Sequence, residues 1–212
     1  MSLRILIADD HGIVRKGLRA VLQSRRGWKI CAEVSNGRDA VQKAKALKPD
    51  VAILDISMPQ LNGVEALRQI RKHSPRTEAL MLSMHRSERL VREAFDAGAR
   101  GYLAKDEADH MLVAAVEAVS HHQPYFNSKI AEAMARERGT QGSKSQRSAL
   151  TPRQREIIQL LAEGKSNKEV AAILAISVKT AETHRANIML RLNLHSFADL
   201  MHYAIRNEII HR

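Results

Sequence analysis

Short apolar runs and amphipathic stretches alternate along the first 121 residues of the chain. Five apolar runs have the length and composition of buried strands, near residues 4–8, 30–34, 51–54, 79–83 and 101–104. The stretches between them carry apolar residues at helical spacing, for example Val14, Leu18, Val21 and Leu22. This alternation predicts an α/β domain with a doubly wound, five-stranded parallel sheet and helices on both faces.

The pattern changes after residue 122. Pro124–Asn127 interrupts the alternation, and Ile130–Arg138 is a short amphipathic stretch. Residues 139–148 contain no apolar side chain, which is typical of a flexible linker. We therefore expect a first domain over residues 1–122, a connecting helix and linker over 123–149, and a second domain over 150–212.

Helix-start signals predict that this second domain is a small all-α module. Thr151–Gln154 and Ser166–Glu169 have the form of a capping box, in which a hydroxyl and an amide or carboxylate cap the helix reciprocally. Ser177 and Ser196 are the expected N-caps of a third and a fourth helix. Four helices joined by short turns follow from these signals.

The second and third of these helices have the layout of a helix-turn-helix. Ala175–Ser177 forms the break between them, and the residues expected on their inner faces are Val170, Ala171, Leu174, Ala181, Ile188 and Leu192. The third helix places Lys179, Glu182, Thr183 and Ala186 on its opposite face, at i, i+3, i+4 and i+7. A polar outward face flanked by basic residues suits a recognition helix in the DNA major groove.

Composition and charge favour a soluble protein with a polyanionic partner. The chain is 44% hydrophobic and 27% charged, with a net charge of +11. Residues 126–212 carry 14 Lys/Arg against 8 Asp/Glu, and residues 1–125 carry 20 against 15. The lone Cys31, expected in a buried strand, excludes an internal disulfide, and neither a signal peptide nor a membrane-spanning run is present. We expect a cytoplasmic protein without a membrane partner.

Residues with phosphoryl-transfer chemistry stand where the predicted strands end. These residues are Asp9 and Asp10, Asp55, Ser83 and Lys105. Open α/β sheets build their sites at this edge. Three carboxylates and the backbone carbonyl of Ser57 could hold Mg²⁺, which prefers oxygen ligands, while Lys105 would supply a fixed cation and Ser83 a hydroxyl donor. A phosphoryl-accepting aspartate with a Mg²⁺ cofactor is therefore predicted.

Residues 2–121 resemble the receiver domain of bacterial two-component response regulators. The resemblance rests on Asp9-Asp10, Asp55 with Met58-Pro59 and Gly63, Ser83, Tyr102 and Lys105 in this order. It implies a flavodoxin-like receiver in which a sensor histidine kinase phosphorylates Asp55 in a Mg²⁺-dependent reaction. By the same resemblance Ser83 and Tyr102 form the switch, and Ser57 and His85 tune how fast the phosphoryl group is hydrolysed. Lys105 is followed by Asp106 instead of proline, so we expect a trans peptide bond there.

The C-terminal module resembles the LuxR-type helix-turn-helix of NarL/FixJ-class regulators. Ser166–Ala171 and Ser177–Arg185 carry the resemblance. It implies that Glu182 and Thr183 read bases and that Lys179, Thr180 and Arg191 hold phosphates of double-stranded promoter DNA. It also implies an active homodimer that reads inverted half-sites. Arg185 falls on the apolar side of its helix, where we expect an internal partner such as Glu169.

These observations together predict a two-domain transcriptional regulator, not an enzyme. One alternative is a phosphatase that uses Asp55 as a covalent nucleophile. Such sheets commonly carry a second acid two positions later, and this chain has Ser57 there. Another alternative is an orphan, phosphorylation-independent DNA-binding regulator or a protein-binding adaptor that keeps the fold.

Overall fold

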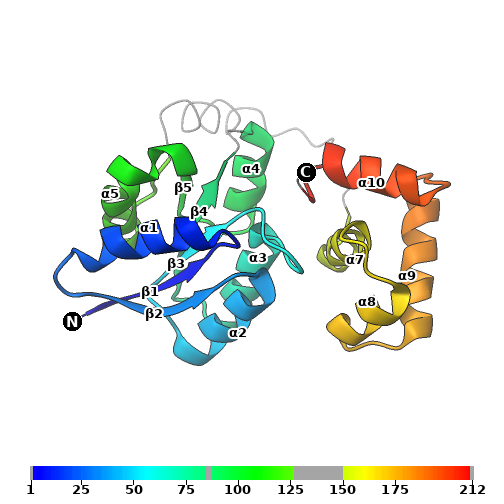
Figure 1. Cartoon of the computed structure of the whole chain (residues 1–212), viewed down its shortest axis with the longest axis horizontal. Coiled ribbons are helices and arrows are strands. Elements are labelled where there is room, and N and C mark those ends of the chain that lie inside the picture. Colours follow the sequence, from blue (N-terminus) through cyan, green and yellow to red (C-terminus); the bar gives the residue numbers. More distant parts are fainter. Residues whose placement is uncertain (1, 85–86, 127–149, 211–212) are drawn as a thin grey trace. The chain divides into compact units, whose positions relative to one another are not determined.

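The computed structural model describes residues 2–84, 87–126 and 150–210. Within these residues the chain forms two compact units, the first built around a sheet and the second helical (Figure 1). The expected connecting helix at 130–138 and the linker at 139–148 lie outside the described residues, as does His85.

The first unit alternates strands and helices as the apolar pattern predicts. Its strands are β1 (Leu3–Ala8), β2 (Trp28–Val34), β3 (Val51–Asp55), β4 (Glu78–Ser83) and β5 (Gly101–Ala104). Its helices are α1 (Gly12–Gln23), α2 (Gly37–Leu47), α3 (Gly63–His73), α4 (Glu88–Asp96), the 3-10 turn η1 (Lys105–Glu107) and α5 (Ala108–Ser120). All strand pairs are parallel, in the order β2-β1-β3-β4-β5, which confirms the predicted doubly wound sheet.

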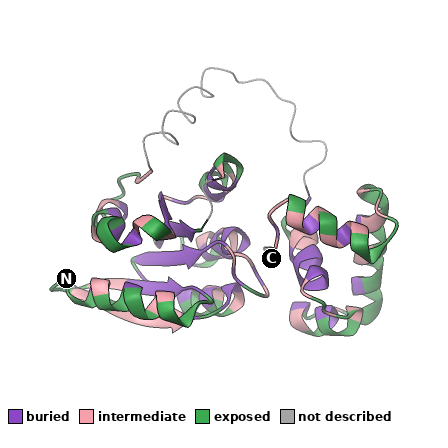
Figure 2. Ribbon diagram, turned by 45° about the horizontal axis from the view of Figure 1, so that its top comes forward, coloured by how far each residue is buried: buried purple, intermediate pink, exposed green. Residues whose placement is uncertain are grey.

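Two apolar clusters cover the two faces of this sheet. Helices α2, α3 and α4 pack on one face, and α1 and α5 pack on the other. Figure 2 shows the strands buried between helices whose outer sides are exposed. The central strand β3 is buried at all five residues, whereas β2 lies at the edge of the sheet and most of its residues are only half-buried. Cys31 is on β2 and is half-buried, so the expectation that it lies in a buried strand is wrong.

The chain adds a short extended segment beside β5 after α5 ends. Tyr125 donates its N–H to the carbonyl of Arg100 (3.0 Å) and accepts the N–H of Tyr102 at its own carbonyl (2.8 Å). Phe126 packs edge-on against Phe95 of α4, with ring centroids 6.0 Å apart. The sequence pattern suggested only an interruption here, because a segment this short shows no strand periodicity.

Within residues 150–210 the second unit contains four helices, as the capping signals predict. They are α7 (Pro152–Ala162), α8 (Asn167–Leu174), α9 (Val178–Arg191) and α10 (Phe197–Arg206). The capping boxes at Thr151 and Ser166 and the N-caps at Ser177 and Ser196 are all present, and Ser196 forms a further box with Asp199. No helix in the described ranges combines the length and the apolarity needed to cross a membrane.

Candidate functional site

Parallel pairing brings the predicted acidic and basic residues to one edge of the sheet. β1 runs into Asp9 and Asp10, and Asp55 is the last residue of β3, the neighbouring strand. Ser83 is the last residue of β4, and Lys105 directly follows β5. Because all five strands point the same way, their carboxyl ends meet at this edge, as predicted.

Lys105 joins two buried carboxylates. Its Nζ atom lies 2.8 Å from Asp9 Oδ2 and 2.9 Å from Asp55 Oδ2. The three side chains are 6%, 0% and 1% exposed, so these charges interact with little screening by water. This pairing connects β1, β3 and the start of η1 through residues that lie far apart in the sequence.

Burial changes the titration of both partners. Burial raises the pKa of the Asp55 carboxyl, and the neighbouring Asp9 charge raises it further, against the opposing effects of Lys105 and the Ser57 N–H. Burial lowers the pKa of Lys105, but the charges and hydrogen bonds of Asp55 and Asp9 outweigh this effect and raise the pKa overall. The lysine therefore stays a cation next to a carboxylate that is more basic than one at the surface.

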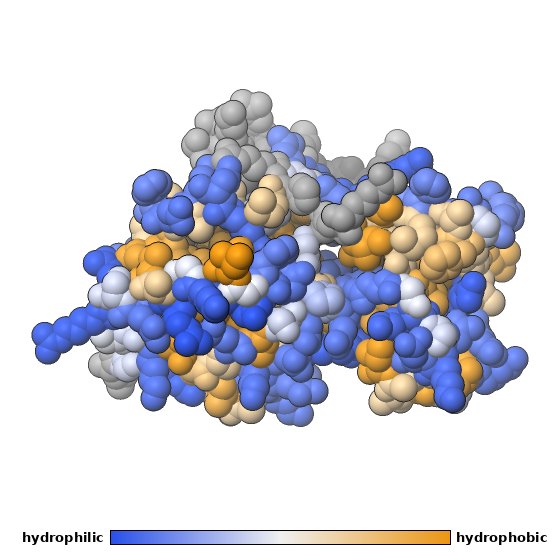
Figure 3. All heavy atoms as spheres, in the orientation of Figure 1, coloured by the Kyte–Doolittle hydropathy of each residue, from blue (hydrophilic) through white to orange (hydrophobic). Residues whose placement is uncertain are grey.

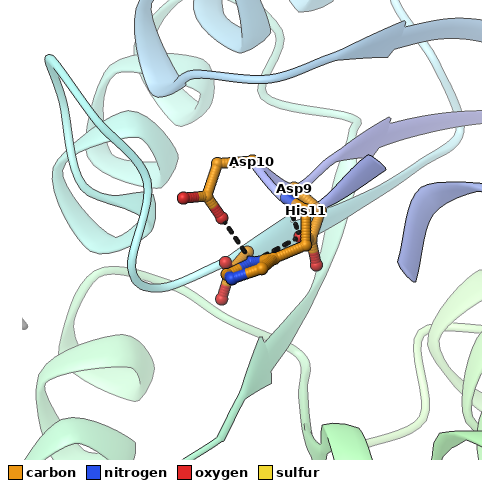
Figure 4. A group of neighbouring side chains, drawn as sticks. Asp9, Asp10 and His11 are labelled. Carbon is orange, nitrogen blue, oxygen red and sulfur yellow. Dashed lines mark hydrogen bonds and ion pairs between the residues drawn. The ribbon is translucent and has the colours of Figure 1, made fainter. Parts of the chain in front are cut away.

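His11 joins the acidic group, and the sequence reasoning missed it. Its Nδ1 atom lies 2.7 Å from Asp10 Oδ1, and its backbone N–H donates to Asp9 Oδ1 at 2.8 Å (Figure 4). His11 occupies the N-cap position of α1. The available signal was its position directly after Asp9-Asp10, but adjacency alone does not reveal which way a side chain points.

The oxygen atoms of this group fit a divalent cation. One potential ligand atom from each of Asp9, Asp10, His11 and Asp55 lies within 4.8 Å of the others. Asp9 Oδ2 and Asp55 Oδ2 are buried and, within the described residues, accept no hydrogen bond of regular geometry, although both lie against the Lys105 ammonium. Buried carboxylate oxygens beside the partly exposed Asp10 form an acidic group that is compatible with a divalent metal ion.

The loop after β3 folds tightly over Asp55. Ser57 donates its backbone N–H to Asp55 Oδ1 at 3.3 Å, and Gly63 donates its N–H to the Ile56 carbonyl at 2.9 Å. A Cβ atom on Gly63 would lie 2.1 Å from the Asp55 carbonyl oxygen. Only glycine allows α3 to begin this close to the end of β3.

The helix-turn-helix expected in the second unit is present as α8 and α9. Ala175 adopts left-handed backbone geometry (φ 51°) and ends α8, and Ser177 caps α9 by accepting the Thr180 N–H. The six residues predicted on the inner faces pack in the core, five of them buried and Leu192 half-buried. The DNA-contact candidates Lys179, Thr180, Glu182, Thr183 and Arg191 are all exposed on α9. Arg191 also donates to Gln154 Oε1 on α7 at 3.2 Å.

Comparison with known proteins decides the family. Residues 5–117 match the response regulator receiver domain, and residues 148–204 match the bacterial regulatory proteins of the luxR family. The chain is a response regulator. It combines a receiver with a LuxR-type DNA-binding domain, and its homologues are transcriptional regulators.

Similarity to individual relatives of this response regulator extends over nearly the whole chain. It is 35% identical to transcriptional regulatory protein MctR of Rhizobium johnstonii, over 99% of this chain and 96% of MctR. It is 34% identical to oxygen regulatory protein NreC of Staphylococcus epidermidis, over 98% and 99% of the two chains. A LuxR-family response regulator from Aurantimonas sp. SI85-9A1 has a crystal structure that matches 66% of this chain and all of its own, with 33% identity and a TM-score of 0.61.

The expected switch residues of the response regulator are both buried. Ser83 is 0% exposed at the end of β4, and Tyr102 is 3% exposed in the core beneath α4. Tyr102 therefore occupies the inward position in this structure, next to the extended segment at Tyr125 that pairs with its backbone. The peptide bond between Lys105 and Asp106 is trans, as expected.

The predicted partner of Arg185 is wrong. Arg185 is half-buried on the inner side of α9, but no carboxylate of the described residues lies within ion-pair distance of it. Glu169 instead accepts the backbone N–H of Ser166 at 2.8 Å and the Ser166 hydroxyl at 2.8 Å. The capping box uses the carboxylate locally, and a local pair closes more easily than one between two helices.

Proposed function

We propose that Asp55 is the phosphoacceptor of this response regulator and that a sensor histidine kinase is the donor. An Asp55 carboxylate oxygen attacks the phosphorus of a phosphohistidine, so that an O–P bond forms and the N–P bond breaks. The histidine nitrogen leaves with the electron pair of that bond and takes up a proton. The observation that carries this proposal is the Lys105 ammonium, buried between Asp9 and Asp55 at the carboxyl edge of the sheet.

The residues around Asp55 favour transfer and retention of the phosphoryl group. Poor solvation makes the Asp55 carboxylate more basic and hence more nucleophilic. Lys105 holds a positive charge within ion-pair distance of the attacking group, where the added phosphoryl charge must be neutralised. Ser57 stands two residues after Asp55, where a second acid would be needed for rapid turnover. We infer a persistent mark, not a phosphatase cycle.

Mg²⁺ is the cofactor we assign to the acidic group. Asp9, Asp10, Asp55 and the Ser57 carbonyl would hold it, and oxygen ligands of this kind suit that ion. When bound, Mg²⁺ neutralises charge on the transferring phosphoryl oxygens.

The output we propose is controlled binding of promoter DNA by a homodimer. Ser83 and Tyr102 would respond to the phosphoryl group, and the LuxR-type module would bind as a pair of copies on inverted half-sites. On each copy, Glu182 and Thr183 would contact bases. The phosphate contacts would come from Lys179, Thr180 and Arg191. The domain boundaries at 1–122, 123–149 and 150–212 stay a prediction, as does action in the cytoplasm, where promoter DNA is found.

Incubation with acetyl phosphate and MgCl₂ tests the proposal. Intact mass should increase by one phosphoryl group in the wild type and in Asp109→Asn, which removes an exposed carboxylate from the first turn of α5. Asp55→Asn should show no increase. A duplex pool with a random central region then reports DNA binding, and phosphorylation should raise its retention by the wild type and by Asp109→Asn but not by Asp55→Asn. Equal retention with and without the phosphoryl group would contradict the switch and favour the phosphorylation-independent alternative.

A further inference from the structure

Three residues on the outermost face of α9 have the spacing that places them side by side on one surface of a helix. Thr183, Asn187 and Leu190 recur at i, i+4 and i+7, which places them within one stripe of an α-helix. The buried residues Ala181 and Ile188 lie on the opposite side of the helix. This stripe is therefore the part of α9 that projects furthest from the core of the module.

The stripe exposes apolar groups where a polar surface is expected. Leu190 is 83% exposed, on a helix face that also carries the charged Lys179. The hydroxyl of Thr183 donates to the Lys179 carbonyl at 2.9 Å, so its proton is used within the helix and its methyl group adds to the apolar surface. The exposed Ala186 adds another methyl group between them. A single surface leucine needs no explanation, but three neighbouring apolar groups form a patch.

Asn187 supplies a hydrogen-bonding group beside this patch. Its side chain is exposed, and within the described residues it has no hydrogen-bond partner. A free side-chain amide offers both a donor and an acceptor. In the major groove, asparagine can bond both N6 and N7 of adenine, and apolar side chains contact the C5-methyl group of thymine.

We propose that the stripe formed by Thr183, Ala186, Asn187 and Leu190 selects A·T base pairs in the major groove. The methyl groups and Leu190 contact thymine methyls, and Asn187 bonds the adenine edge. This inference rests on the proposed function, in which α9 is the recognition helix. Lys179 and Arg191, exposed near the two ends of the helix, give the positive charge that a DNA partner requires.

A second copy of the chain is the competing occupant of this face. Figure 3 shows hydrophobic side chains over α10 and the adjoining end of α9, and Phe197 of α10 is 44% exposed. Leu190 differs from Phe197 because the same face of α9 also carries Lys179, Thr183 and Asn187. A face that combines methyl, amide and ammonium groups is chemically more complementary to base edges and phosphates of DNA than to the same face of a second copy of the chain.

Chemically altered DNA tests the inference directly. The phosphorylated full chain selects duplexes from a random pool, and the enriched duplex is remade with deoxyuridine for thymidine, which removes only the methyl group. Affinity should fall about fourfold for each contacted methyl group. Replacing adenine by 7-deazaadenine should weaken binding at the position that Asn187 reads.

Substitutions at Leu190 and Asn187 show which residue is responsible for each loss of DNA affinity. At the thymine that Leu190 contacts, replacement by uracil should no longer weaken the binding of Leu190→Ala. Leu190→Met should still bind the thymine duplex more tightly than the uracil duplex. Asn187→Ala should lose the discrimination against 7-deazaadenine. The high exposure of Leu190 predicts unchanged melting temperatures, which circular dichroism checks.

Three outcomes would overturn the inference. If the enriched duplex binds equally well with thymine and with uracil, the A·T assignment fails while the proposed function stands. If Leu190→Ala lowers the sedimentation mass of the free protein and leaves the uracil effect intact, the stripe is a contact between copies. If no duplex is enriched, DNA recognition by α9 fails together with the proposed function.

Discussion

At the scale of single residues, the acidic group at the carboxyl edge of the sheet concentrates charge where the fold would otherwise exclude it. Asp9 and Asp55 are almost fully buried, and Lys105 supplies one positive charge between them. Two carboxylates and one ammonium leave an excess negative charge in a region of low polarity, which destabilises the folded chain. The divalent cation that we propose for this site would offset this excess charge.

Asp55→Asn should therefore stabilise the protein in metal-free buffer. The neutral amide has nearly the same shape and removes one buried negative charge, so we expect the melting temperature to rise by about 2–5 °C. Thermal unfolding in EDTA measures this change, with Asp109→Asn as the surface control. A lower melting temperature for Asp55→Asn would show that its pair with Lys105 stabilises the fold more than burial destabilises it.

Glu78 provides a pH-dependent contact at the start of β4. Its oxygen atoms lie 3.2 and 3.3 Å from Arg100 nitrogens, and His122 Nδ1 lies 2.8 Å from Oε1. Burial raises the pKa of Glu78, but these hydrogen bonds and the charges of Arg100 and Arg71 outweigh burial and lower the pKa below 4.5. Ionised Glu78 therefore stabilises the fold above pH 4.5, and this contribution is lost as the pH falls through the lowered pKa.

The matching prediction compares Glu78→Gln with wild type by urea unfolding across the pH range. The free energy of unfolding lost in Glu78→Gln should be largest at neutral pH. This loss should shrink as the pH drops below 4.5 and through the lowered pKa of Glu78. Glu117→Gln removes a half-exposed carboxylate that pairs with Arg25, and its effect should stay within about 0.5 kcal/mol. A Glu78→Gln loss that is the same at acidic and neutral pH would argue against the ionic origin.

At the scale of elements, the connection from β3 to α3 positions Asp55. Gly63→Ala should lower the free energy of unfolding by about 2–3 kcal/mol, because its Cβ atom would overlap the Asp55 carbonyl oxygen. Gly17→Ala is the matched control, since this helical glycine of α1 has no atom within 4 Å of the new Cβ. The control should gain about 0.5–1 kcal/mol from helix propensity. Equal effects of the two substitutions would exclude a steric role for Gly63.

At the scale of the whole molecule, a net charge of +11 is shared between two units with different tasks. Charge anywhere on the protein attracts DNA at long range, but only residues in contact with phosphates release counterions on binding. The salt dependence of DNA affinity should therefore depend more on the position of a lysine than on the total charge.

Lys179→Ala tests that distinction through the salt dependence of DNA affinity. The slope of log affinity against log salt should become shallower by about one for each bound copy of the module, because a phosphate contact is lost. Lys29→Ala removes the same charge from an exposed position on β2 and should leave the slope unchanged. Fluorescence anisotropy between low and physiological salt measures both variants. If Lys179→Ala and Lys29→Ala changed the slope by the same amount, Lys179 would act only through the overall charge.

Much of the fold and of the site can be predicted from local patterns in this chain. The five strands and the caps at Thr151, Ser166, Ser177 and Ser196 are specified by residues within a few positions of one another. The strand-end residues Asp55 and Lys105 follow from the same patterns, because parallel strands align their carboxyl ends.

The sequence alone therefore determined the order of the elements, the edge of the sheet that holds the site and the outward face of α9. Only the tertiary structure decided which groups meet: Lys105 between Asp9 and Asp55, His11 against Asp10, the segment at Tyr125 beside β5, and Arg185 without the expected Glu169. Each of these outcomes depends on side-chain rotamers and on neighbours brought together by packing. Periodicity describes which side of an element a residue occupies, but it carries no information about its partner across space.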